Sequence, residues 1–131
     1  MAISFAAALG IHDKALALHS QRAEVLANNM VNADTPGFKA RDMDFRALLD
    51  SRIEHDVTLT RTNSRHLSTA GAGVPEAQLG YRIPLQPSLD GNTVDLQIEQ
   101  AEYAKNALRF QSSFTFLNGK FRGLSKAIKG E

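Results

Sequence analysis

Four histidines and a few carboxylates are the side chains of this sequence best suited to chemistry. His12 and His19 fall on one face of a predicted helix, but seven residues separate them, about 10.5 Å along the axis, which is too far to share one metal ion. His55 and His66 lie in an irregular stretch without a second ligand at a recognisable spacing. We therefore expect histidines that are satisfied in a core or at an interface, and neither a metal site nor a bound cofactor.

Other catalytic patterns are missing from the sequence as well. The chain has no cysteine, which removes thiolate catalysis, disulfides and cysteine metal sites. Gly71-Ala72-Gly73 lacks the following lysine of a phosphate-binding loop. Asp42 and Asp44 alternate with a basic and an apolar residue, which is more typical of a solvated face than of an acid–base pair. The sequence therefore predicts a protein that is not an enzyme and has no small-molecule substrate.

Composition limits the architecture and the partners. The 131 residues are 43% hydrophobic, which suffices for one domain with a modest core. Because 14 acidic residues balance 15 basic ones, no strong field attracts nucleic acid or an anionic membrane. The N-terminus lacks a basic n-region and no apolar run is long, so we expect neither a cleaved secretory signal nor a membrane span.

Two long amphipathic helices, one at each end of the chain, must position these side chains. In the first, expected over residues 4–33, Ile11, Leu18 and Val25 repeat every seven residues. Further apolar residues between them widen the apolar arc to about 200°. This arc is wider than the contact with one partner helix requires.

Two polar residues, Arg22 and Asn29, lie near this apolar arc. We expect the Arg22 side chain to extend from the edge of the core into solvent. For Asn29 two interpretations stay open. It is either such an edge residue or a buried amide that fixes register and partner choice.

The second helix is expected over residues 93–129, about 55 Å long. Its start is predicted from Asn92 as the N-cap and Asp95 at the third helical position. Its apolar residues recur with alternating spacings of three and four, the pattern of a coiled coil. We call them the apolar stripe, which comprises Leu96, Tyr103, Phe110, Phe114, Leu117, Phe121, Leu124 and Ile128.

Between the helices lies a middle segment of irregular chain. Residues 57–62 alternate as a strand does, residues 68–80 have the composition of a flexible loop, and residues 81–89 are extended and fixed by prolines. The predicted fold is mainly α, with long terminal helices that pack as a coiled-coil-like bundle and short β elements between them. The predicted parts are residues 1–34, 35–92 and 93–131.

A single copy of the chain cannot cover both apolar helix faces. Packing one helix on the other leaves a large apolar strip exposed, which soluble monomers rarely tolerate. A head-to-tail contact that does not close on itself generates an open helical array. We therefore expect the chain to assemble with other copies of itself through its terminal helices.

Two stretches of the sequence resemble a known family. LANN at residues 26–29, Asn32 and TPGFK at residues 35–39 resemble the N-terminal signature of bacterial flagellar axial proteins. The continuation ARDMDF at residues 40–45 and the block QPSLDGNTVDL at residues 86–96 are similar to proximal rod subunits of the flagellar basal body. The resemblance covers nearly the whole chain.

The resemblance implies a structural subunit of the rod, the shaft that crosses the periplasm and transmits torque from the motor to the hook. It implies export through the flagellar type III apparatus without a cleaved signal. The implied partners are the rod proteins FlgC, FlgF and FlgG, the adaptor FliE and the MS-ring protein FliF. Two alternatives stay open: another rod subunit similar to FlgC, against which residues 87–95 argue, and a soluble helical adaptor or export chaperone.

The candidate site is thus an assembly surface. Amide side chains can pair across subunits without net charge, and two phenylalanines would anchor the outgoing chain on a neighbouring helix. Thr35, Pro36 and Gly37 are predicted to form a type II turn after the first helix. The predicted interface comprises the apolar stripe together with Ile11, Leu18, Val25, Asn28, Asn29, Asn32, Phe38 and Phe45.

Overall fold

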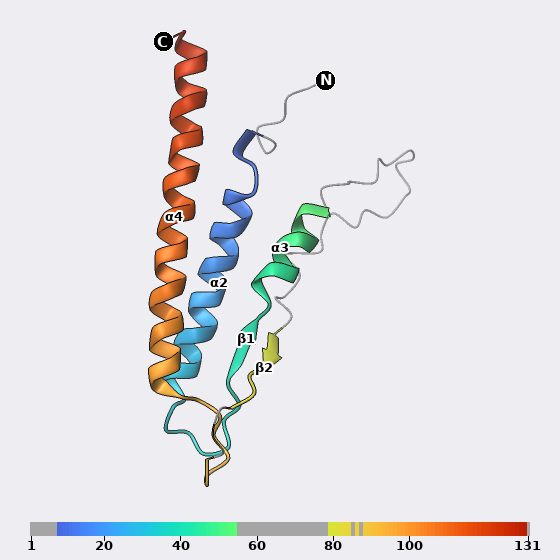
Figure 1. The fold of residues 1–131 in the computed structure, drawn as a ribbon, viewed down its shortest axis with the longest axis vertical. Helices are drawn as coiled ribbons and strands as arrows, with labels where there is room; N and C mark the ends of the chain where they lie inside the picture. Colours follow the sequence, from blue (N-terminus) through green and yellow to red (C-terminus); the bar gives the residue numbers. More distant parts are fainter. Residues whose placement is uncertain (1–7, 55–78, 85, 87, 131) are drawn as a thin grey trace, which may run out of the picture.

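A computed structural model describes residues 8–54, 79–84, 86 and 88–130. The described chain is mainly helical, which confirms the predicted fold class. None of its helices is both long enough and apolar enough to cross a lipid bilayer. In chain order the elements are α2 (His12–Val31), β1 (Arg41–Met43), α3 (Phe45–Glu54), β2 (Leu79–Tyr81) and α4 (Leu96–Lys129) (Figure 1).

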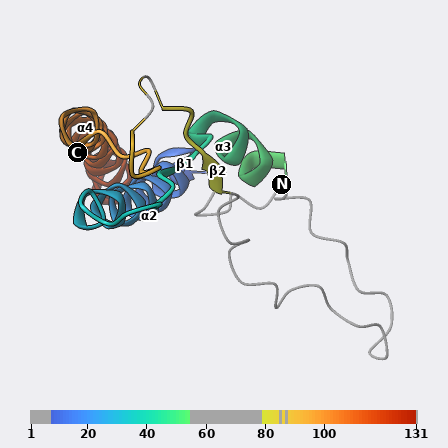
Figure 2. The ribbon, with the colours of Figure 1, turned by 90° about the horizontal axis from the view of Figure 1, so that it is seen from below.

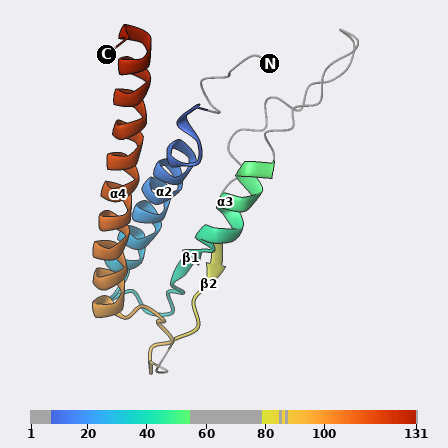
Figure 3. The same cartoon turned by 45° about the horizontal axis from the view of Figure 1, so that its top comes forward.

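The terminal helices α2 and α4 lie side by side and run in opposite directions (Figure 1). On another side, α2 contacts β1 and α3 (Figure 2), and β1 pairs antiparallel with β2. Because α4 has 34 residues and α2 has 20, α4 extends past the start of α2 (Figure 3). The predicted pairing of the terminal helices is therefore present, and the C-terminal part of α4 projects beyond it.

Few apolar side chains are fully buried in the described chain. Half of them belong to α2, which contacts both α4 and the β1–α3 side. A core of this size leaves most of the large apolar side chains of α4 partly exposed. The buried apolar residues are Leu9, Ala15, Leu18, Leu26, Ala40 and Met43.

The N-terminal helix differs from its predicted bounds. Its expected start lies outside the described residues, and a turn at Gly10 precedes His12. Gly10 has φ 68°, a left-handed conformation that glycine adopts easily and that interrupts an α-helix. The helix ends at Val31, two residues before the predicted end.

The start of α4 was predicted three residues too early. Asp95 is the N-cap, because its carboxylate accepts hydrogen bonds from the backbone N–H groups of Gln97 and Ile98 at 3.0 and 3.2 Å. Asn92 does not cap the helix, since its side-chain amide is held by backbone carbonyls beyond the end of α2. A long-range contact thus replaces the local cap that the sequence predicted.

The middle segment contains a helix that the sequence analysis missed. The Asp44 carboxylate accepts hydrogen bonds from the N–H groups of Arg46 and Ala47, both at 3.1 Å, and so caps α3. The last two residues of the predicted flexible loop pair with β1 and belong to β2. The predicted strand at residues 57–62 and the rest of that loop lie outside the described residues.

Candidate functional site

The contact between α2 and α4 contains a row of polar side chains, which we call the polar seam. Five of its six members are less than 9% exposed, and the sixth, Glu102, is half-buried. In the described part of the chain, every buried side-chain nitrogen or oxygen has a hydrogen-bond partner, as stable burial of polar groups requires. The polar seam comprises His19, Arg22 and Asn29 of α2 with Glu99, Glu102 and Asn106 of α4.

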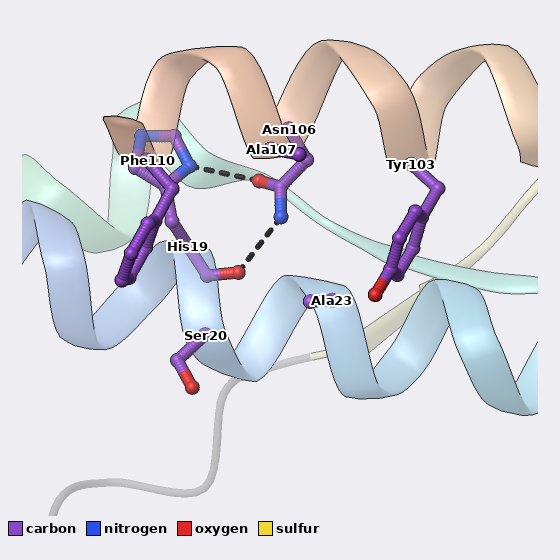
Figure 4. A pocket seen from close by; sticks show the side chains of 7 residues that line it. All are labelled: His19, Ser20, Ala23, Tyr103, Asn106, Ala107 and Phe110. Carbon is purple, nitrogen blue, oxygen red and sulfur yellow. Dashed lines mark hydrogen bonds between the residues drawn. The ribbon is translucent and has the colours of Figure 1, made fainter. Parts of the chain in front are cut away.

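His19 and Asn106 form two contacts of the polar seam. Nδ1 of His19 lies 2.8 Å from Oδ1 of Asn106, and the Asn106 amide donates to the His19 carbonyl at 2.8 Å (Figure 4). The His19 ring also stacks on Phe45, with 4.3 Å between ring centroids. Burial lowers the pKa of His19 despite the Asn106 hydrogen bond, and nearby Arg109 and Arg22 lower it further. The prediction of a satisfied histidine is therefore confirmed for His19.

Asp42 of β1 connects the polar seam to the β ladder. Its carboxylate accepts hydrogen bonds from Nε and Nη2 of Arg22 at 3.0 and 2.8 Å, and from Arg82 at 2.6 Å. Arg22 also donates to Glu102 at 3.0 Å, and Arg82 donates to Glu99. Two arginines thus join one carboxylate of β1 and two of α4 through charge-assisted hydrogen bonds. We call these five side chains the ionic cluster.

Burial and hydrogen bonding act in opposite directions on the carboxylates of the ionic cluster. Burial raises the pKa of Asp42, but the hydrogen bonds from Arg22 and Arg82 outweigh it and hold this pKa below its ordinary value of 3.8. At Glu99, burial outweighs the Asn29 hydrogen bond and the charge of Arg82, and raises the pKa above 4.5. Glu99 is therefore the first carboxylate of the cluster to accept a proton as the pH falls.

Both the nitrogen and the oxygen of the Asn29 side-chain amide form hydrogen bonds within the chain. Its Nδ2 donates to the Arg41 carbonyl at 2.7 Å and to Glu99 at 3.2 Å, and its Oδ1 accepts from the Arg41 N–H at 3.1 Å. The residue is 2% exposed. The structure thus supports the interpretation of Asn29 as a buried amide that joins segments.

Two predictions for polar residues are wrong. Arg22 does not extend into solvent, because carboxylates of Asp42 and Glu102 meet its guanidinium and allow it to be buried. Asp42 is not part of a solvated face, although its neighbour Asp44 is exposed. Arg82 was missed altogether, because residues that meet through the fold share no spacing pattern in the sequence.

The apolar stripe flanks the polar seam instead of filling the contact between the helices. Leu117 and Leu124 are half-buried, while the other six stripe residues are 39–86% exposed. At about 100° per residue, Phe114 lies roughly 60° around α4 from Glu99. The heptad pattern predicted that the stripe packs on the first helix and on neighbouring subunits, but it could not show that polar residues of α2 find polar partners in the helix contact.

A groove of about 250 Å³ lies between α2 and α4, beside the polar seam (Figure 4). Tyr103 and Phe110 of the apolar stripe line it, together with the small residues Ala23 and Ala107. No acidic residue, lysine or arginine lines the groove. His19, Ser20 and Asn106 complete the lining, and a groove with aromatic walls and no such charged side chain suits an apolar side chain of another helix.

A second contact joins the end of α2 to the start of α4. Gly37 has φ 72°, and the N–H of Phe38 donates to the Thr35 carbonyl at 3.3 Å, which is the geometry of a turn with glycine at its second central position. The Asn92 amide donates to three backbone carbonyls within residues 32–35, at 2.7–3.0 Å. We call this set of three hydrogen bonds the Asn92 clasp.

Several other predicted interface residues make contacts inside the chain. Leu18 is fully buried, Phe45 lies against His19 of α2, and the Asn32 amide donates to Asn28 Oδ1 at 2.8 Å. Their contacts with other subunits remain a prediction. The predicted residues outside α4 that are exposed or half-buried include Ile11, Val25, Asn28, Asn32, Thr35, Pro36, Gly37 and Phe38.

The described residues hold no group of three or more His, Cys, Asp or Glu side chains that could bind a metal ion. His12 stacks on Phe116 of α4, with 5.3 Å between ring centroids. His55 and His66 lie outside the described residues. The distinctive surface of the described chain is the apolar stripe beside the groove.

Comparison with known proteins decides the family. Residues 9–39, which include α2 and the turn after it, match a family model described as flagella basal body rod protein. The chain is 49% identical to the flagellar basal body rod protein FlgB of Aeromonas hydrophila, over 100% of this chain and 99% of that protein. The chain is also 43% identical to FlgB of Escherichia coli K12, over 94% of each protein. It is 42% identical to FlgB of Salmonella typhimurium LT2, over 95% of this chain and 94% of that protein. The chain belongs to the FlgB family.

Members of the FlgB family are structural proteins, and this chain is a structural subunit of the flagellar basal body rod. It belongs to the basal body and assembles with other flagellar rod components. The predicted resemblance is confirmed, and neither a FlgC-like subunit nor a soluble adaptor is favoured, since FlgB relatives match nearly the full length. The α2 side of the polar seam lies within the segment that the rod family model matches.

Proposed function

We propose that this FlgB-family chain is built into the proximal rod through the apolar stripe of α4 and the groove beside it. The observation that carries the proposal is the exposure of six stripe residues while polar side chains occupy the contact between α2 and α4. Burying a large apolar side chain contributes about 1.5–3 kcal/mol. Neighbouring subunits that cover the stripe therefore stabilise the assembled state.

The assembled rod acts as the drive shaft that transmits torque from the motor to the hook. Close-packed apolar side chains resist displacement, so stripe residues interlocked between subunits oppose sliding. Within each subunit, the ionic cluster links α2, β1 and α4. This linkage supports the transfer of load between the terminal helices and the rest of the chain.

The proposed partners are other copies of the chain, the rod proteins FlgC, FlgF and FlgG, the adaptor FliE and the MS-ring protein FliF. The chain reaches the rod through the flagellar type III export apparatus without a cleaved signal, and there it spans the periplasm. Residues 1–34 and 93–131 are its axial parts, residues 35–92 are its middle segment, and it has no catalytic role. Family membership supports these assignments.

Photo-cross-linking in assembled basal bodies tests the proposed surface. Benzoylphenylalanine replaces Phe114 of the stripe in one strain and Ser112 in the control strain. Ser112 is also exposed, but lies about 160° around α4 from Phe114. We expect adducts with rod proteins from position 114, identified by mass spectrometry, and far fewer from position 112. Adducts from position 112 alone, or from neither position in strains that build rods, would contradict the proposal.

A further inference from the structure

We propose that the polar seam, together with Arg109, fixes the register of α4 against α2. The apolar stripe cannot do so alone, because its pattern repeats every seven residues. Sliding α4 by one heptad, about 10.5 Å, brings Phe110 to the place of Tyr103 and Phe121 to the place of Phe114. Apolar packing therefore distinguishes these registers poorly, whereas polar side chains in such seams can specify one of them.

The polar seam does not repeat with this period. After a slide of one heptad, Arg22 would face Arg109 in place of Glu102. Arg22 is 8% exposed, and although it would keep Asp42, a like charge in place of Glu102 beside a buried guanidinium disfavours that register. The residues seven positions after Glu99, Glu102 and Asn106 are Asn106, Arg109 and Ser113.

A slide in the opposite direction meets another obstacle. It would place Arg22 opposite Asp95, whose charge is complementary. However, α4 begins at Leu96, and Asp95 is occupied as its N-cap. The slide would also pull Asn92 away from the three carbonyls of the Asn92 clasp. Repulsion therefore opposes one slide, the loss of the N-cap opposes the other, and either slide would break the Asn92 clasp.

A unique register matters for assembly, and this consequence rests on the proposed function. The position of α4 along α2 determines where the apolar stripe and the groove lie on each subunit. Copies with different registers would present different surfaces and could not occupy equivalent places in a rod. Buried charge pairs are often no more stabilising than apolar packing, so the polar seam contributes specificity rather than strength.

Engineered disulfides can report the register, because the natural chain has no cysteine. The rings of His12 and Phe116 stack at 5.3 Å, so His12→Cys with Phe116→Cys reports the observed register. His12→Cys with Gly123→Cys reports the register shifted by one heptad. An added Cβ at Gly123 would meet no atom within 4 Å. Both reporter pairs are oxidised in the purified full-length chain.

Each reporter pair is combined with changes in the polar seam. In the exchanged seam, Glu102→Arg with Arg109→Glu reverses the charges that Arg22 meets in the two registers. In the apolar seam, Glu102→Leu with Arg109→Leu gives Arg22 the same uncharged neighbour in both registers. The control is Ser112→Glu, which adds a charge on the face of α4 away from α2.

In the unchanged chain and in the Ser112→Glu control, we expect the observed-register disulfide to form about tenfold more, or better, than the shifted-register disulfide. The reason is that breaking a buried ion pair is costly. In the exchanged seam this preference should fall at least about tenfold. In the apolar seam the preference should also fall, because Arg22 meets leucine in both registers. If the observed-register disulfide dominates to the same degree in the unchanged chain, the control and both altered seams, then loops or apolar packing set the register. That result would overturn the proposal.

If the exchanged chain does not fold by circular dichroism, the apolar seam decides the question, because leucine is a strong helix former. The disulfides are measured on the purified chain and do not depend on rod incorporation. Cross-linking from position 114 tests the proposed function separately. A failure of one proposal can therefore be distinguished from a failure of the other.

Discussion

At the scale of single residues, this chain buries polar groups where a simple amphipathic pattern predicts apolar ones. Arg22, Asn29 and Glu99 are all nearly inaccessible to solvent, and each is held by partners from another segment. Leaving any of these groups without its partner would cost the full desolvation penalty. These residues therefore define one arrangement of α2, β1 and α4.

His19 gives this burial a pH dependence. Its pKa in the folded chain lies below the ordinary value of 6.5, chiefly because it is buried. The unfolded chain then binds a proton at higher pH than the folded chain, so the free energy of unfolding falls as the pH drops below about 6.5 and levels off below the folded-state pKa. His19→Gln should remove this part of the decline, measured by urea denaturation between about pH 8 and pH 5.

The matched control for this change is His12→Gln, which replaces the other histidine of α2. It should retain the decline, because His19 is still present. If the natural chain and the His19→Gln chain lose stability in parallel over the same pH range, the burial of His19 has no such effect.

At the scale of elements, the sequence predicted the parts that local patterns determine. Heptad spacing located both terminal helices, and the Pro36-Gly37 pair indicated the turn where Gly37 indeed has a positive φ. The pattern also placed the apolar stripe within one continuous helix, as α4 shows. It could not show that Glu99 and Asn106, three positions after Leu96 and Tyr103, would face α2.

Competition between local and distant partners explains the errors at element ends. Asn92 is a good N-cap by type, but carbonyls some sixty residues earlier in the chain hold its amide, and Asp95 caps α4 instead. For α3 a local signal did exist, since Asp44 precedes a run of helix-forming residues. The ionic cluster carried no such signal, because Asp42 and Arg82 meet only through the pairing of β1 with β2.

The Asn92 clasp provides a test at this scale. Asn92→Ala leaves three carbonyls at the end of α2 without the side-chain amide, and should lower the free energy of unfolding by about 1–3 kcal/mol. Asn118→Ala is the control, since Asn118 is an exposed amide on α4 and should change stability by no more than about 0.5 kcal/mol. Urea denaturation of both chains measures the difference. Equal stability of the two variants would mean that the clasp does not hold the helices together.

At the scale of the whole molecule, polar contacts join the helices inside one subunit and apolar side chains remain for contacts outside it. Helix α4 continues past the start of α2 (Figure 3), and Ile128 of the stripe, near the end of α4, is 86% exposed. A monomer gains little from such a surface, since exposed apolar patches favour association. A subunit of the flagellar basal body rod, in contrast, has neighbours that can cover it.

The most direct test of this assembly surface is the recovery of rods from a strain that produces Phe114→Asp, beside a strain that produces Ser112→Asp. Phe114 is 55% exposed, so the purified Phe114→Asp chain should keep the circular dichroism spectrum of the natural chain. A charge in the covered stripe should nevertheless prevent incorporation. We predict that detergent-washed basal bodies lack the Phe114→Asp chain and that the cells do not swim, while the Ser112→Asp strain builds rods and swims. Normal swimming of the Phe114→Asp strain, with natural amounts of the chain in its basal bodies, would contradict the proposed role of the apolar stripe.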